Sequence, residues 1–216
     1  MNTIIKYTNL LGQTITEEQM LSLKEFNKLT FIDGLLKIKE HHIESSKIGK
    51  CVEFCYFLSG IEDKNVIVQQ YTNQQLNHRC TVYFNEYFEN GYTLWDKEGY
   101  SNAGILKRKF KEVFNQDRKM IMQLKLNIEN NNVIEAEKYY YKNQIQTELD
   151  DLLLEFEYDD KGQLTYIKDV NEFYGYIWQI DLKTFLEDIQ FSQIDFPWDK
   201  NTYYHSLYPL IPGGHQ

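Results

Sequence analysis

Hydrophobic and polar residues alternate along much of the chain, the pattern of half-buried β-strands. The clearest case runs from Met120 to Ile128, where the even-numbered residues are apolar. The run Asn130-Asn131-Asn132 predicts a turn, because Asn tolerates the left-handed backbone conformations that turns require. Val133 to Tyr141 is therefore predicted to return as the partner strand, and Leu152 to Asp169 predicts a further hairpin.

Two dipeptides predict tight hairpin turns. Asp33-Gly34 and Asn90-Gly91 each lie between apolar arms, where residues that accept positive φ are favoured. Apolar stretches elsewhere in the chain predict additional strands at 50–59, 64–71 and 176–180.

Two helices are predicted, one near each end of the chain. Thr16 and Gln19 form a capping box at the start of a helix over Glu17–Asn27, with Met20 and Phe26 on its apolar side. Asp181 is the predicted N-cap of a second helix over 182–190. The three prolines lie in the last twenty residues, so 209–216 is expected to form an irregular, mobile end.

These elements predict an α+β fold, a predominantly antiparallel β-sheet built of hairpins with a short N-terminal helix and a C-terminal helix. A single domain over 1–216 is expected, because no linker-like segment divides the chain. The alternative is a pair of β-rich lobes, 1–105 and 106–216.

The composition agrees with this fold and narrows the function. The 216 residues include 17 Tyr, 13 Phe and 3 Trp, which favour strands. No apolar run is long enough to span a membrane, and the polar opening argues against a cleaved leader. Three Cys are too few for a disulfide framework. A soluble cytoplasmic protein is expected.

The net charge of −9 is concentrated in one quarter of the chain. Residues 1–143 carry 18 acidic and 19 basic side chains, whereas residues 144–199 carry 14 acidic and 3 basic ones, a net of −11. Many aromatic residues lie in this acidic segment, and aromatic anchors beside carboxylates are typical of protein-binding surfaces. The alternative is a solvated acidic face over an aromatic core. The predicted partner-binding residues are Asp150, Asp151, Glu155, Glu157, Tyr158, Asp159 and Asp160.

Metal or acid–base chemistry has a few candidate residues. Cys51, Cys55, His78 and Cys80 are zinc-ligand types, but their spacings differ from the common zinc motifs, and buried core cysteines are the favoured interpretation. The adjacent pair His41-His42 and the lone His205 are further candidates, with ordinary structural roles as the alternative. No catalytic or nucleotide-binding motif is present, so no catalytic residue, metal or cofactor is predicted.

A short basic cluster between Lys107 and Lys119 is the only indication of nucleic-acid binding. It lies in an acidic protein, so a solvated element face is favoured and no nucleic-acid partner is predicted.

Three segments carry a resemblance to a known group of proteins. These are the opening Tyr7-Thr-Asn-Leu-Leu-Gly-Gln-Thr-Ile-Thr-Glu-Glu-Gln, the hairpin Phe31–Glu40, and Tyr158-Asp-Asp-Lys-Gly-Gln-Leu-Thr-Tyr. They resemble Bacteroidetes-type immunity proteins encoded beside polymorphic toxins. The resemblance implies a cytosolic protein that binds and occludes a cognate toxin, and it transfers no catalytic residues.

The leading hypothesis is an immunity-type inhibitor whose acidic, aromatic C-terminal surface binds a basic toxin domain. Nucleases are often basic because they bind phosphate, so an acidic inhibitor would compete for the same site. The alternatives are an uncharacterised metal-dependent enzyme and a structural β protein without a dedicated ligand. The sequence leaves the oligomeric state open.

Overall fold

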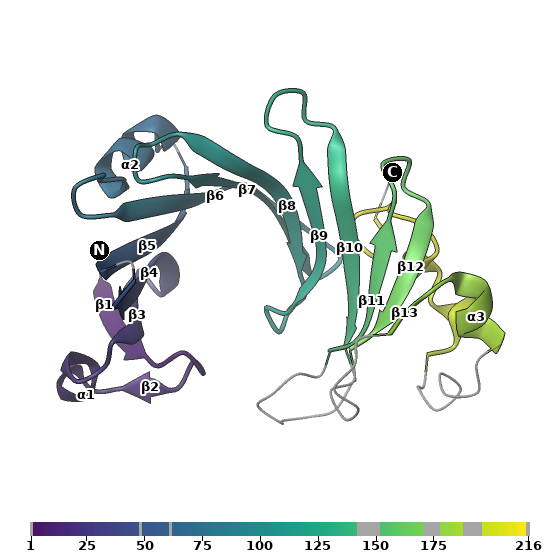
Figure 1. The fold of residues 1–216 in the computed structure, drawn as a ribbon, viewed down its shortest axis with the longest axis horizontal. Coiled ribbons are helices and arrows are strands. Elements are labelled where there is room, and N and C mark those ends of the chain that lie inside the picture. The colour runs from purple at the N-terminus through teal and green to yellow at the C-terminus, as the bar shows by residue number, and fades with distance from the viewer. Residues whose placement is uncertain are drawn as a thin grey trace. The chain divides into compact units, whose positions relative to one another are not determined.

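A computed structural model describes residues 2–47, 49–60, 62–141, 152–170, 178–187 and 196–214 (Figure 1). The chain divides into two compact units. Unit 1 comprises residues 1–85 and 96–109, and unit 2 comprises residues 86–95 and 110–216. Both are dominated by β-strands, and all but one of the described strand pairings given by register are antiparallel. The predicted, mainly antiparallel sheet is therefore confirmed.

Unit 1 contains the N-terminal strands in the order β2-β1-β3-β4-β5-β6. The exception to antiparallel pairing is β5 with β6, which run parallel because helix α2 connects them. The elements are β1 (Thr3–Thr8), β2 (Thr14–Ile15), α1 (Glu17–Leu21), β3 (Glu25–Ile32), β4 (Leu35–Ser45), β5 (Gly49–Phe57) and α2 (Lys64–Tyr71).

Three strands run from one unit into the other along the chain. They are β6 (His78–Glu89), β7 (Tyr92–Tyr100) and β8 (Leu106–Phe114). The single domain over 1–216 and its alternative, two lobes over 1–105 and 106–216, both stay predictions.

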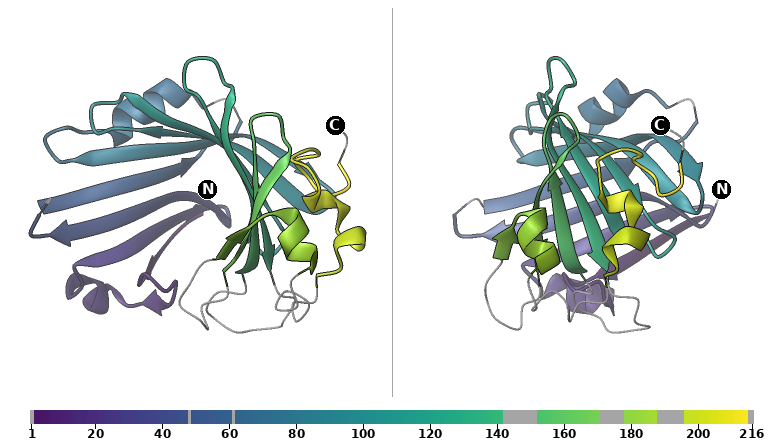
Figure 2. Two further views of the ribbon diagram at one scale, coloured as in Figure 1. Left: turned by 45° about the vertical axis from the view of Figure 1, so that its right-hand side comes forward. Right: turned by 90° about the vertical axis from the view of Figure 1, so that its right-hand side faces the viewer.

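Unit 2 continues with hairpin-connected strands in the order β9-β10-β11-β12-β13. One face of these strands is covered by α3 and the C-terminal segment 196–214 (Figure 2). The elements are β9 (Met120–Leu126), β10 (Val133–Tyr141), β11 (Leu152–Tyr158), β12 (Leu164–Asp169), β13 (Trp178–Ile180), α3 (Leu182–Glu187), and the 3-10 turns η3 (Trp198–Lys200) and η4 (Thr202–Tyr204).

The predicted turns are present. Asp33 and Gly34 have φ of 49° and 85°, and Asn90 and Gly91 have φ of 52° and 82°. Asn131, in the predicted asparagine turn, has φ of 60°. These positive φ values are the conformations that favour Asn, Asp and Gly at such positions.

The N-terminal helix begins as predicted but is shorter. The Thr16 hydroxyl accepts from the Gln19 N–H at 3.2 Å, and the Gln19 side chain accepts from the Thr16 N–H at 2.9 Å. The helix ends at Leu21 instead of Asn27, because Glu25–Ile32 pairs as β3 with both β1 and β4. Phe26 therefore lies on a strand, where its ring stacks on His42 with centroids 4.6 Å apart.

The predicted strand at 64–71 is wrong, because this segment is helix α2. The β-branched run in this segment favours a strand, but Asp63 caps a helix by accepting from the Asn65 N–H at 2.7 Å. Ile67 and Val68 are then buried against a core cluster that includes Tyr56 and Val82. Packing of the apolar helix face outweighs local strand propensity.

The C-terminal helix α3 is described from Leu182 to Glu187, and the rest of its predicted range lies outside the described residues. The final segment is irregular, as expected, but it is packed: Leu207 is 1% exposed and Ile211 is 4% exposed. In the described part of the chain, no helix has the length and apolar character needed to cross a membrane.

Candidate functional site

Three carboxylates gather on the sheet face of unit 2 that lies opposite the C-terminal segment. Glu137 of β10 is directly opposite Glu157 of β11, and Glu155 of β11 is opposite Lys168 of β12. Oxygen atoms of Glu137, Glu155 and Glu157 all lie within 4.8 Å of one another. We call the three glutamates, together with Lys168 and Tyr166 of β12, the acidic face.

A single ammonium group lies among these carboxylates. The Lys168 Nζ donates to Glu155 Oε1 at 2.5 Å and also forms an ion pair with Glu157. Its distance to Glu137 Oε1 is 4.0 Å. Three negative charges and one positive charge leave an excess of two negative charges in a half-buried cluster.

The electrostatics of the cluster appear in two pKa shifts. Burial alone would lower the pKa of Lys168, but hydrogen bonds and charges from Glu155 and Glu157 outweigh burial and raise it above its usual range. Burial and the nearby charge of Glu155 raise the pKa of Glu137 above its ordinary value, although the Tyr139 hydroxyl donates to Glu137 at 2.6 Å. Lys168 therefore leaves part of the repulsion at Glu137 uncompensated.

An exposed aromatic ring borders the carboxylates. Tyr166 is opposite Glu157 in the β11–β12 register and is 46% exposed. The Gln179 amide of β13, which pairs with the far side of β12, donates to Glu157 at 3.0 Å. Sequence reasoning missed Glu137 and Lys168 as members of this site, and it counted Tyr166 only among the many aromatic residues of the acidic segment. The alternation of Tyr166 and Lys168 with buried Ile167 is the signal that places these two on one face.

The structure brings together only part of the predicted binding set. Glu155 and Glu157 belong to the acidic face, whereas Tyr158 lies on the opposite face, is 5% exposed, and donates its hydroxyl to the Tyr204 carbonyl at 2.9 Å. The Asp159 carboxylate accepts from the Lys161 and Gln163 backbone, which is turn chemistry. Asp160 is exposed in the same turn, and Asp150 and Asp151 lie outside the described residues.

The described aromatic residues of the acidic segment mostly form core. Phe156 is fully buried and Phe196 is 7% exposed, and Trp198 and Tyr204 pack against the same cluster. Tyr166 is the exception that could serve as a surface anchor.

The four zinc-type residues do not converge. Successive residues of a strand point to opposite faces, and His78 is directly opposite Val52 in the parallel pair. Cys51 and Cys55 thus point to one face of the unit 1 sheet, while His78 and Cys80 point to the other. Burial raises the pKa of the Cys80 thiol to about 12, as expected of a core cysteine.

Within the described chain, the acidic face is the single group of three or more potential ligands close enough to share an ion. The Lys168 ammonium already lies among these oxygens, so the cluster is arranged around an internal cation.

The histidines have separate local partners. His41 contacts Glu25 at 2.9 Å, while the neighbouring His42 contacts Glu40 at 3.1 Å. His205 stacks on Trp198 with centroids 4.1 Å apart, and its ring nitrogen lies 2.9 Å from the Trp198 carbonyl oxygen. None of these pairs forms a nucleophile–base arrangement.

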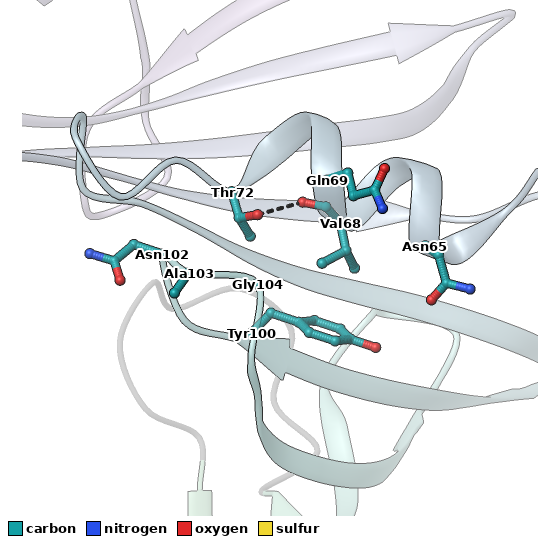
Figure 3. A pocket seen from close by; sticks show the side chains of 8 residues that line it. All are labelled: Asn65, Val68, Gln69, Thr72, Tyr100, Asn102, Ala103 and Gly104. Carbon is teal, nitrogen blue, oxygen red and sulfur yellow. Dashed lines mark hydrogen bonds between the residues drawn. The ribbon is translucent and has the colours of Figure 1, made fainter.

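A pocket of about 520 Å³ lies in unit 1 between α2 and residues 100–104 (Figure 3). Its lining is neutral, and several polar groups already have partners. The Thr72 hydroxyl donates to the Val68 carbonyl at 2.7 Å, and the Tyr100 hydroxyl donates to Glu98 at 2.5 Å. The Asn102 amide donates to Asn77 at 3.2 Å. The pocket therefore presents no charged or catalytic group to a ligand.

Comparison with known proteins gives no assignment. No protein-family model, curated protein or solved structure matches this chain. The resemblance to immunity proteins thus stays a prediction, and the candidate function rests on the geometry of the acidic face.

Proposed function

We propose that this protein is a toxin inhibitor of the immunity type and that the acidic face binds a basic surface of its cognate toxin. The observation that carries this proposal is the charge imbalance around Lys168, where three carboxylates share one ammonium group. A lysine or arginine of a partner would supply the missing positive charge. Association would also be steered by the wider field of the acidic unit.

The charge distribution between the units supports the same choice of surface. Residues 86–95 and 110–216 carry 21 acidic and 10 basic side chains, a net of −11. Residues 1–85 and 96–109 carry 11 acidic and 13 basic ones, a net of +2. A basic toxin surface would attract both the acidic unit 2 and a phosphate-bearing substrate, so the two would compete for that surface.

Tyr166 supplies the contact that charge alone cannot provide. Exposed tyrosines are frequent energetic hot spots because the ring buries a large area and its hydroxyl still forms a hydrogen bond. The ring lies beside Glu157, so one docked basic side chain would contact both. Inhibition on this basis is occlusion, and the protein needs no catalytic residue, metal or cofactor. Its cytoplasmic location remains a prediction.

A growth-protection assay tests the proposal. The probe is the product of the gene adjacent to this chain's gene, which the proposal requires to be a toxin, expressed in bacterial cells with or without this protein. We expect the native chain to restore growth and Tyr166→Ala to weaken protection. The matched control is Tyr87→Ala, because Tyr87 is 51% exposed elsewhere in unit 2. Absence of protection by the native chain would overturn the proposal.

A further inference from the structure

Strand β1 has an edge that is only partly paired. On one side it pairs with β3 from Thr3 to Thr8, but on the other side it pairs with β2 only at Tyr7 and Thr8. Among the described residues, the edge from Thr3 to Lys6 therefore has no neighbouring strand. Ile4 and Ile5 are 42% and 50% exposed on this segment. An open edge with exposed isoleucines is a template for strand addition.

The backbone hydrogen bonds show which residues face this edge. The Asp33 N–H donates to the Asn2 carbonyl at 2.8 Å, and the Asn2 N–H donates to the Asp33 side chain at 2.7 Å. Asn2 thus directs its backbone groups toward the β3 side. These directions alternate along an antiparallel strand, so Ile4 also faces β3, while Thr3 and Ile5 face outward. Tyr7 faces outward by the same alternation, in agreement with its pairing with β2.

We propose that a second copy of this chain pairs with this edge, antiparallel and related by a two-fold axis at Ile4. In this register, Thr3 is opposite Ile5 of the second copy, and Ile5 is opposite Thr3 of the second copy. Four hydrogen bonds form, and they use every outward N–H and C=O of both residues in both chains. The two Ile4 side chains then meet on one face of the extended sheet.

Two-fold axes at the neighbouring residues would leave outward backbone N–H and C=O groups without a partner. A two-fold axis at Ile5 would place Thr3 opposite Tyr7, whose outward groups already pair with Ile15. An axis at Thr3 would pair the two Thr3 residues and leave the outward groups of Ile5 without a described partner. The edge is therefore self-complementary about Ile4, because in this register the second copy supplies a partner for every outward backbone group of Thr3 and Ile5 and leaves none unused on either chain. The contact is small, so the dimer is expected to depend strongly on protein concentration.

Cysteine cross-linking of the full-length chain tests the register. Ile4 would form a non-hydrogen-bonded pair with its own copy, with Cα atoms about 4.5 Å apart, within the range of about 4.4–6.8 Å that a disulfide accepts. Ile4→Cys is therefore expected to form a covalent dimer under mild oxidation. Ile5→Cys is the matched control, because two copies of Ile5 lie two residues out of register and beyond disulfide reach. The native chain gives the background from its own cysteines, and circular dichroism confirms that each variant is folded.

A charge pair gives a second test that does not depend on oxidation. Ile4→Glu and Ile4→Lys each place like charges opposite each other and should be monomeric, with the mass of 26.0 kDa in sedimentation equilibrium. An equimolar mixture of the two variants should regain the doubled mass. The proposal is overturned if the native chain remains monomeric at the highest concentration, if Ile4→Cys and Ile5→Cys cross-link equally, or if the mixture remains monomeric.

Discussion

The Lys138 ammonium donates to the Tyr203 carbonyl oxygen at 2.6 Å and lies 3.5 Å from the centroid of the same tyrosine's ring. Lys138 also donates to the carbonyls of Ser206 and Pro209, at 2.9 and 3.1 Å. The side chain is fully buried in the described structure, on the face of β10 opposite Glu137. Strand β10 thus carries Glu137 of the acidic face on one side and the lysine that holds the C-terminal segment on the other.

Replacing Lys138 should loosen the C-terminal segment. Lys138→Met leaves three carbonyls without their donor, and an unsatisfied buried acceptor costs about 1–3 kcal/mol. Because the substitution also removes the cost of burying an ammonium group, we expect a net loss of about 1–3 kcal/mol in the free energy of unfolding. Urea unfolding followed by tryptophan fluorescence measures this. Lys161→Met, at an exposed turn position, is the control and should change stability by less than about 0.5 kcal/mol. Equal effects of the two substitutions would contradict a structural role for Lys138.

The stability of the native chain should also rise with pH above neutrality. Burial lowers the pKa of Lys138 to about 7, whereas the same group in the unfolded chain keeps its ordinary value near 10.5. Between these values the unfolded state binds more protons than the folded state, so the free energy of unfolding increases with pH. Unfolding measured from pH 7 to 9.5 should show this rise, and Lys138→Met should flatten it. The same slope in both proteins would exclude Lys138 as its source.

Lys168 should matter most where its three carboxylate partners are ionised. In Lys168→Met, Glu137, Glu155 and Glu157 lose their shared ammonium and repel one another, so the variant should be less stable than the native chain at pH 7. Burial and the charge of Glu155 raise the pKa of Glu137, so acidification neutralises it readily and the difference from the native chain should shrink as the pH falls. The control is Lys125→Met, which removes an exposed ion pair between Lys125 of β9 and Glu135 of β10. A pH-independent difference would show that packing rather than charge is responsible.

The strands and turns were largely predictable, because alternation and turn residues are local signals. Val133 to Tyr141 forms β10 with the predicted bounds, and the Asp159 turn adopts its expected hydrogen bonds. Helix α2 was not predictable, since the helix depends on packing of Ile67 and Val68 against strands distant in sequence.

The candidate site was predictable only in part. Glu155 and Glu157 follow from the charge count, and their alternation with Phe156 places both on one face. Glu137 joins them only through the β10–β11 register, which places it opposite Glu157, 20 residues away in the sequence. Tyr158 was assigned to the surface by its acidic neighbours, but its place in the strand alternation directs it to the core.

The most direct test of the central claim is the salt dependence of association with the product of the adjacent gene, the toxin that the proposal requires. Stopped-flow measurements would compare the native chain with Glu155→Gln/Glu157→Gln and with the control Glu17→Gln/Glu18→Gln, which alters exposed residues of α1 in unit 1. We expect the native chain and the control to associate rapidly and to slow with added salt. The acidic-face variant should associate about tenfold more slowly at low salt, with a shallower salt dependence. Equal rates and equal salt dependence for all three proteins would contradict binding through the acidic face.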